Sequence, residues 1–246
     1  QPAPGAQIID VAGRYITPGF IDIHTHTDDY WPNKGDGLMV LNQGVTTHIV
    51  GNCGTSVSNV AEYLDSVEGA AINIGTFYGY KALRRSFLSD TAAMTDTALA
   101  QMETQLAAAI DNGALGLSWG LSYYPQNKAG YEELLALAKV VKEKDALLAN
   151  HIRDEYGGVV ASVEEMINLT RDSGVCMQYN HIKAAGTANW DQQDQILQLF
   201  NAAIAEGLDI RGDAYVYEFS SWDVSGTGVS VSMDNIKKVL QNPYVM

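Results

Sequence analysis

The sequence PGFIDIHTHTD, residues 18–28, joins a short apolar run to a His-x-His pair formed by His24 and His26. Side chains alternate between the two faces of a β-strand, so two residues separated by one lie on the same side. Both imidazoles can therefore reach a single ion. The stretch predicts a short buried strand that carries metal ligands at its carboxyl end.

Six further apolar runs alternate with longer helical patterns along the chain. Together with the first run, they give seven predicted strands at residues 19–26, 46–52, 72–79, 116–120, 147–151, 176–181 and 209–215. Between the strands, apolar residues recur at spacings of three and four, as at Leu99, Met102 and Leu106, which is typical of amphipathic helices. Ser162 and Glu165 resemble a capping box that would begin one such helix. This alternation predicts an α/β fold of the (β/α)8 TIM-type barrel class.

Seven strands are one fewer than a closed barrel needs, so we expect only strands one to seven here, with the eighth beyond Met246. Residues 1–18 differ from the repeating pattern, and we interpret them as the end of a small β-domain, the remnant of a β-sandwich, that leads into the barrel. Residues 19–246 are predicted to form the barrel, with its C-terminal part missing. The remainder of the same polypeptide or a complementary chain is therefore an expected partner.

The chain is acidic, with 15 Lys and Arg residues against 29 Asp and Glu residues and a net charge of −14. Charge of this sign repels phosphate groups, which makes nucleic acid and anionic membrane surfaces poor partners. No apolar run approaches the ~18 residues that a membrane span needs. Two cysteines cannot form a disulfide framework. We expect a cytoplasmic protein, and the start at Gln1 rather than Met leaves an extracytoplasmic location open.

Three more potential metal ligands lie at the ends of predicted strands. Cys53 follows one strand, and His151 and His181 are the last residues of two others. The carboxyl ends of parallel barrel strands open onto one face, where the active sites of barrels lie. Four histidines and one cysteine on that face are suited to zinc. His48 lies inside its strand, so we interpret it as a core residue or one that supports the metal ligands. Cys176 begins a strand, so we interpret it as a buried structural thiol.

Several motifs together resemble the D-aminoacylase branch of the amidohydrolase superfamily, the N-acyl-D-amino-acid deacylases. They are PGFIDIHTHTD (18–28), QGVTTHIVGNCG (43–54), GALGLSWGLSYYP (113–125), NHIRDE (150–155), NHIKAAG (180–186) and GDAYVY (212–217). The resemblance implies a zinc-dependent hydrolase that cleaves the amide bond of small-molecule N-acyl-D-amino acids to a D-amino acid and a carboxylate. It also implies a tight zinc site at Cys53, His151 and His181, and a weaker second site at His24, His26 and the same cysteine.

The resemblance further implies a set of residues that hold the substrate, with a lysine near its α-carboxylate. These residues are Lys183, Tyr123, Tyr215 and Ser221. Three charged residues of NHIRDE are expected to orient the loop after His151 rather than touch substrate, and they are Arg153, Asp154 and Glu155.

The chain also departs from the family pattern. Tyr80 in GYKALR stands where relatives often have a histidine, and Val216 replaces the proline of an AYPY motif. The aspartate that ends strand eight, the expected general base, is not among the 246 residues, and neither Asp213 nor Asp223 is its equivalent. The 246-residue chain alone is therefore expected to be inactive.

Two alternatives remain open at this point. Another amidohydrolase could act on cyclic amides or carbamoyl compounds, and such relatives bridge two metals with a carboxylated lysine. No lysine stands at the end of the fourth predicted strand, in residues 116–125. The chain could instead be a non-catalytic metal-binding fragment or pseudoenzyme that lacks its base.

Overall fold

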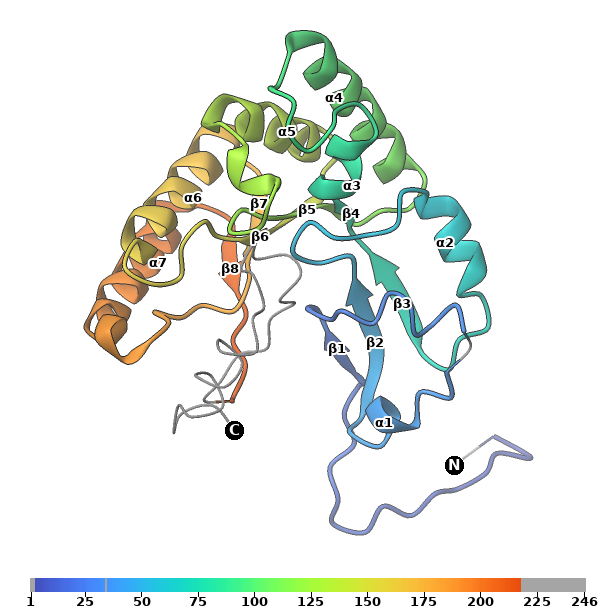
Figure 1. The fold of residues 1–246 in the computed structure, drawn as a ribbon. Coiled ribbons are helices and arrows are strands. Elements are labelled where there is room, and N and C mark those ends of the chain that lie inside the picture. Colours follow the sequence, from blue (N-terminus) through green and yellow to red (C-terminus); the bar gives the residue numbers. More distant parts are fainter. Residues whose placement is uncertain (1–2, 34, 218–246) are drawn as a thin grey trace, which may run out of the picture.

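The computed structural model describes residues 3–33 and 35–217, which fold into two parallel sheets (Figure 1). The first sheet has the order β1 (Phe20–Asp22), β2 (Val45–Val50), β3 (Asn73–Thr76). The second has the order β4 (Tyr78–Gly79), β5 (Gly116–Gly120), β6 (Leu147–His151), β7 (Cys176–Tyr179), β8 (Ile210–Gly212). Every strand pairs in parallel with its neighbours in this order.

The two sheets are successive parts of one curved arrangement, because only Phe77 separates β3 from β4. The Phe77 N–H donates to Val50 O at 3.0 Å, and the Leu115 N–H donates to Thr76 O at 2.9 Å, so backbone hydrogen bonds continue across the interruption. All seven predicted strands are therefore present, the third as β3 and β4. In the described part of the chain, β8 and β1 are not hydrogen-bonded to each other. The loops that follow these two strands nevertheless meet, because His24 contacts Asp213.

Helices connect the strands and cover the outer side of the sheets (Figure 1). They are α1 (Leu38–Leu41), α2 (Val60–Ser66), α3 (Tyr80–Arg85), α4 (Asp96–Asp111), α5 (Tyr131–Glu143), α6 (Val159–Ser173) and α7 (Gln193–Glu206), with 3-10 turns η1 (Gln126–Lys128) and η2 (Thr187–Gln192). Gly174 and Gly207 end α6 and α7 in the left-handed conformation that favours glycine. The predicted capping box at Ser162 is wrong, because α6 begins earlier and the Ser162 hydroxyl accepts the Asp154 N–H at 3.1 Å instead.

The main core lies between the second sheet and its helices, where side chains such as Leu117, Trp119 and Leu148 are fully buried. Met102 and Leu106, on the predicted apolar face of α4, belong to this core. A smaller cluster beside the first sheet is built around Trp31. Burial of these large side chains fixes the strands against the helices, and thereby fixes the loops at the strand ends.

The beginning of the chain differs from the sequence prediction in two respects. The sequence predicts that β1 is buried, but its three residues are exposed, because no described strand or helix covers them. β1 has only three residues, so His24 and His26 lie in the loop after the strand and not on it. Residues 3–18 form no helix or strand, and their assignment to a small β-domain stays a prediction. No helix in the described part of the chain has the length and apolar character to cross a membrane.

Candidate metal centre

A cavity of about 550 Å³ opens at the carboxyl ends of the strands. Its lining includes all five predicted metal ligands, His24, His26, Cys53, His151 and His181, and three of the predicted substrate residues, Tyr123, Lys183 and Tyr215. The fourth predicted substrate residue, Ser221, lies outside the described residues, as does Asp223. Loops that follow β1, β2, β5, β6, β7 and β8 therefore bring these distant residues together.

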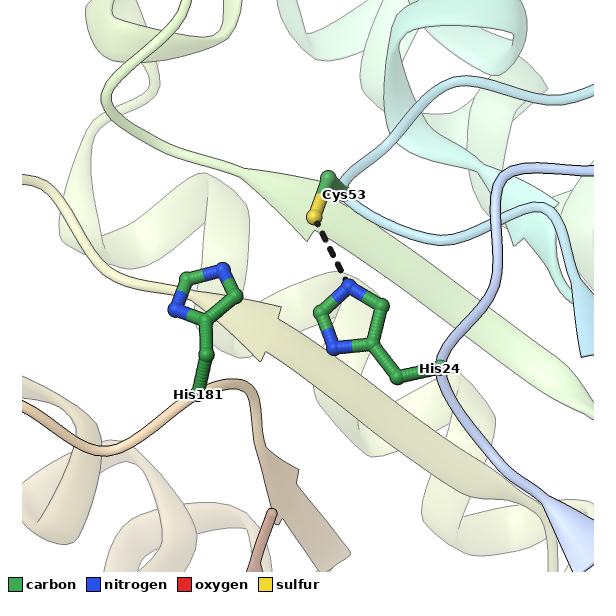
Figure 2. Close-up of side chains that lie close together, drawn as sticks. All are labelled: His24, Cys53 and His181. Carbon is green, nitrogen blue, oxygen red and sulfur yellow. Dashed lines mark hydrogen bonds between the residues drawn. The ribbon is translucent and has the colours of Figure 1, made fainter. Parts of the chain in front are cut away.

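Cys53 lies close to His24 and His181, and a hydrogen bond joins it to His24 (Figure 2). Its side chain is buried, and Sγ lies 3.5 Å from His24 Nε2 and 3.6 Å from His151 Nδ1. His24, Cys53 and His181 can offer one donor atom each within 4.8 Å of one another. His26 is exposed at the cavity, and its ring centre lies 5.4 Å from that of His24.

Three of the histidines are oriented by a second partner on the nitrogen that faces away from the thiol. His24 Nδ1 lies 3.3 Å from the Asp213 carboxylate, and His181 Nδ1 lies 2.7 Å from Glu155 Oε1. His151 Nε2 lies 2.7 Å from Ser122 Oγ. Metal-binding histidines characteristically have such a partner on the other ring nitrogen, which fixes the ring and the tautomer. The arrangement leaves Nε2 of His24 and His181, and Nδ1 of His151, for a metal.

The donor atoms fit a zinc ion. Zinc–ligand bonds of about 2.0–2.3 Å in a tetrahedron place neighbouring donor atoms about 3.3–3.8 Å apart. The separations of Cys53 Sγ from the His24 and His151 nitrogens, 3.5 and 3.6 Å, lie within that interval. A thiol surrounded by imidazoles is also a donor set that suits zinc.

The electrostatics of the cluster favour a thiolate. Burial alone would raise the pKa of Cys53, but hydrogen bonds from the four surrounding imidazoles hold it well below its usual range. For an imidazole, burial acts in the opposite direction and would lower the pKa. The hydrogen bonds of His24 to Asp213 and Cys53 nevertheless raise its pKa to about 10. The pKa of His181 is also raised, against the effect of burial, by Cys53 and Glu155. The lowered pKa of Cys53 therefore favours the thiolate, which is the form that binds metals.

Two carboxylates complete this charge arrangement, that of Glu155, which is buried, and that of Asp213, which is half-buried. Burial would raise the pKa of Glu155, but the hydrogen bond from His181 and nearby positive charges lower it to about 2. The pKa of Asp213 is lowered against burial by its hydrogen bond to His24. Asp213 also accepts the His181 N–H at 2.6 Å, so it fixes both histidines at once. Both carboxylates are therefore charged at neutral pH.

The three described substrate residues of the prediction lie next to the histidine cluster. Lys183 Nζ donates to Glu155 Oε1 at 2.6 Å and lies 5.4 Å from the centre of the Tyr215 ring. The Tyr123 ring centre is 4.8 Å from that of His151. Lys183, Tyr123 and Tyr215 thus border the same cavity as the potential ligands.

The charged residues of NHIRDE have separate contacts. Glu155 lines the cavity and contacts His181 and Lys183. The sequence analysis expected it to orient the loop after His151, but both of these partners lie on another loop, the one after β7. Arg153 binds the Glu165 carboxylate and two backbone carbonyls, those of Asn127 and Ala129. Asp154 accepts the N–H groups of Tyr156 and Gly158 and stabilises its own loop.

Sequence reasoning missed Ser122 and Asp213, which contact two of the ligand histidines. It named Glu155 but did not place this residue in the cavity. Ser122 and Asp213 each lie shortly after a strand end, which is the one signal that could have marked them. By contrast, His48 lies outside the cavity lining and contacts Thr27 Oγ1 at 3.1 Å, as expected of a core residue.

Two other residues can be placed. Cys176 is half-buried and lies 3.6 Å from Arg211 Nη1, so the expectation of a buried thiol is only partly met. Tyr80 is fully buried, donates its hydroxyl hydrogen bond to Glu133 and is not part of the cavity lining. Tyr80, which stands where relatives often have a histidine, is therefore part of the core.

Comparison with known proteins gives consistent matches over most of the chain. The model of the amidohydrolase family matches residues 7–221. D-aminoacylase of Alcaligenes xylosoxydans xylosoxydans is 32% identical over 235 residues, covering 85% of this chain and 48% of that protein. N-acyl-D-glutamate deacylase of the same organism is 33% identical over 244 residues, covering 89% of this chain and 50% of that protein.

A solved structure of a related protein also matches most of this chain. N-acyl-D-glutamate deacylase from Bordetella bronchiseptica, crystallised with zinc and a phosphonate inhibitor that mimics the tetrahedral intermediate, matches with a TM-score of 0.78 and 32% identity. The match covers 81% of this chain and 48% of that one. The chain spans about half the length of the curated relatives it matches.

Proposed function

The chain belongs to the amidohydrolase family, and from this we propose that the protein hydrolyses the amide bond of N-acyl-D-amino acids. The products would be a D-amino acid and a carboxylate. One observation carries the proposal, namely a buried cysteine among four histidines in a cavity that also contains a lysine. The relatives named above as a D-aminoacylase and N-acyl-D-glutamate deacylases support it.

We assign the metal to zinc, with the tight site at Cys53, His151 and His181. The weaker site would use His24 and His26 and share Cys53. The match of the thiol–imidazole distances to zinc geometry supports this assignment. Zinc, when bound, polarises the acyl carbonyl and lowers the pKa of a water molecule toward about 7.

The side chains of this protein would supply orientation and charge. Lys183 presents a cation that is fixed by Glu155 and stands beside the Tyr215 ring, which suits it to bind the α-carboxylate of the substrate. Anchoring that carboxylate decides which face of the scissile carbonyl meets the nucleophile, so it selects the chirality at Cα. Asp213 already accepts hydrogen bonds from His24 and from the His181 backbone, and we therefore do not assign it as the general base.

The other expected features stay predictions. Hydrolysis of cyclic amides is less favoured, because residues 116–125 contain no lysine for a carboxylated bridge. A small-molecule substrate follows from the proposed reaction. The cytoplasmic location and the lack of nucleic-acid or membrane partners rest on the sequence alone.

The test is an amidase assay on the full natural protein loaded with zinc. N-acetyl-D-amino acids should be cleaved, their L-enantiomers should be left nearly untouched, and a hydantoin should not be opened. Zinc binding without amide cleavage would favour a pseudoenzyme, and faster opening of the hydantoin would favour the cyclic-amide alternative.

Lys183→Met is the informative variant for the substrate residues. It should raise KM for the D-substrate by about 10- to 100-fold, the value of a lost charge-assisted hydrogen bond. Zinc content should stay unchanged, because the lysine is not a proposed ligand. Lys144→Met is the matched control, since Lys144 pairs with Asp111 on the outer surface. An unchanged KM for Lys183→Met would contradict the assigned role.

A further inference from the structure

Cys53 lies in a turn with an unusual backbone. Gly51, Cys53 and Gly54 have φ values of 74°, 54° and 76°, in the left-handed region. Glycine adopts this region readily, but a residue with a side chain does so rarely and only where its surroundings hold it there. Something in the structure must therefore fix the backbone of Cys53.

Gln126 provides one such constraint. Its side chain is fully buried, Nε2 donates to Cys53 O at 3.1 Å, and Oε1 accepts the Gly120 N–H at 2.8 Å. A Cβ added to Gly54 would lie 1.8 Å from Gln126 Oε1, so the glutamine packs directly on the turn. Gln126 thus joins the Cys53 turn to the end of β5.

Ser118 provides a second constraint from within β5. It is fully buried, its Oγ accepts the Gly54 N–H at 3.0 Å, and its hydroxyl donates to Gly51 O. The two side chains bind the turn 51–54 through three of its residues. These three contacts are all with main-chain groups of the turn, so both side chains act on the Cys53 backbone.

The turn that carries Gln126 is itself fixed to the His151 loop. Arg153, two residues after His151, donates to Asn127 O at 3.2 Å and to Ala129 O at 2.6 Å. The loops that hold Cys53 and His151 are thereby connected through Gln126 and the turn η1.

We propose that Gln126 is a positioning residue for the metal centre, which with Ser118 holds the Cys53 turn so that Sγ lies between the imidazoles of His24 and His151. The inference rests on the proposed zinc site. Without the glutamine amide, the Cys53 backbone can relax and displace Sγ from these two nitrogens.

The test compares Gln126→Met with Gln105→Met in the full natural protein. Gln105, on α4, donates to Tyr78 OH away from the cavity, so it controls for the loss of a partly buried glutamine. Zinc affinity, measured by competition with a chelator, should fall by about 10- to 100-fold in Gln126→Met, as expected for loss of a supporting residue, and stay unchanged in Gln105→Met. The thiolate-to-metal absorption band of the cobalt-substituted protein should change only in Gln126→Met.

Gln126→Glu decides the matter if Gln126→Met does not fold. Glutamate keeps the size of the side chain and the acceptor for the Gly120 N–H, but its carboxylate cannot donate to Cys53 O and repels that carbonyl oxygen. Unchanged zinc affinity and an unchanged cobalt band in a folded Gln126 variant would overturn the inference. If the unsubstituted protein bound no zinc, the proposed function would fail first, so the two failures are distinguishable.

Discussion

Glu155→Gln is the substitution that tests most directly how the histidines are oriented. Glu155 is 5% exposed, and one oxygen, Oε1, contacts both His181 Nδ1 at 2.7 Å and Lys183 Nζ at 2.6 Å. Glutamine keeps the shape and one acceptor oxygen but removes the negative charge. The hydrogen bond to His181 is therefore weakened, while the ring stays in contact with its neighbours.

The magnitude follows from the kind of contact that is lost. A hydrogen bond to a charged group contributes about 1.5–3 kcal/mol, and each 1.4 kcal/mol is tenfold in an equilibrium constant. Complete loss would weaken zinc binding by about 10- to 150-fold. Because glutamine still offers a neutral acceptor, we expect the lower end, about tenfold.

The assay is zinc titration of the metal-free protein against a competing chelator at neutral pH. Glu206→Gln is the matched control, since Glu206 pairs with Arg171 on the exposed surface and should leave zinc affinity unchanged. A folded Glu155→Gln protein whose zinc affinity differs from the unsubstituted protein by less than about threefold, roughly 0.6 kcal/mol, would refute the reasoning.

Two further predictions concern the metal itself. Cys53→Ser should lower zinc content much more than His24→Ala, because the cysteine serves both proposed sites and His24 only the weaker one; equal losses in elemental analysis of the folded variants would contradict this asymmetry. Zinc binding near pH 7 should release protons and become tighter as the pH rises, because the pKa of His181 is raised and its imidazole must lose a proton to bind a metal. Calorimetry in buffers of different ionisation enthalpy measures the release, and binding that weakens toward higher pH would be inconsistent with it.

The strand pattern could be predicted from sequence because buried parallel strands are short apolar runs bounded by polar residues and glycine. All seven predicted strands occur, and the five predicted ligands line one cavity. The ligands could be placed because a parallel barrel puts every strand end on one face, so position along a strand translates into position in space.

The supporting contacts could not be predicted in the same way. Asp213 reaches His24 across 189 positions in sequence, and Gln126 reaches Cys53 across 73. Such pairs depend on how loops of different βα units pack, and no local period records that packing. The same limit explains the error at Ser162, whose hydroxyl binds the backbone of a preceding loop instead of beginning a helix.

The charges around the cavity suggest why the two carboxylates are needed with or without zinc. Cys53, Glu155 and Asp213 bring three negative charges into a largely buried region, and burial of charge is costly unless opposite charge compensates it. The contacts of His24 with Asp213 and Cys53, and those of His181 with Glu155 and Cys53, raise the pKa values of both histidines, so their positive charge, with that of Lys183, can supply this compensation when no metal is bound. A zinc ion at the proposed site would replace those protons on the nitrogens that face the thiol, while Asp213 and Glu155 would still hold the opposite nitrogens. The ring orientations therefore need not change on metal binding, and the site is organised before the ion arrives.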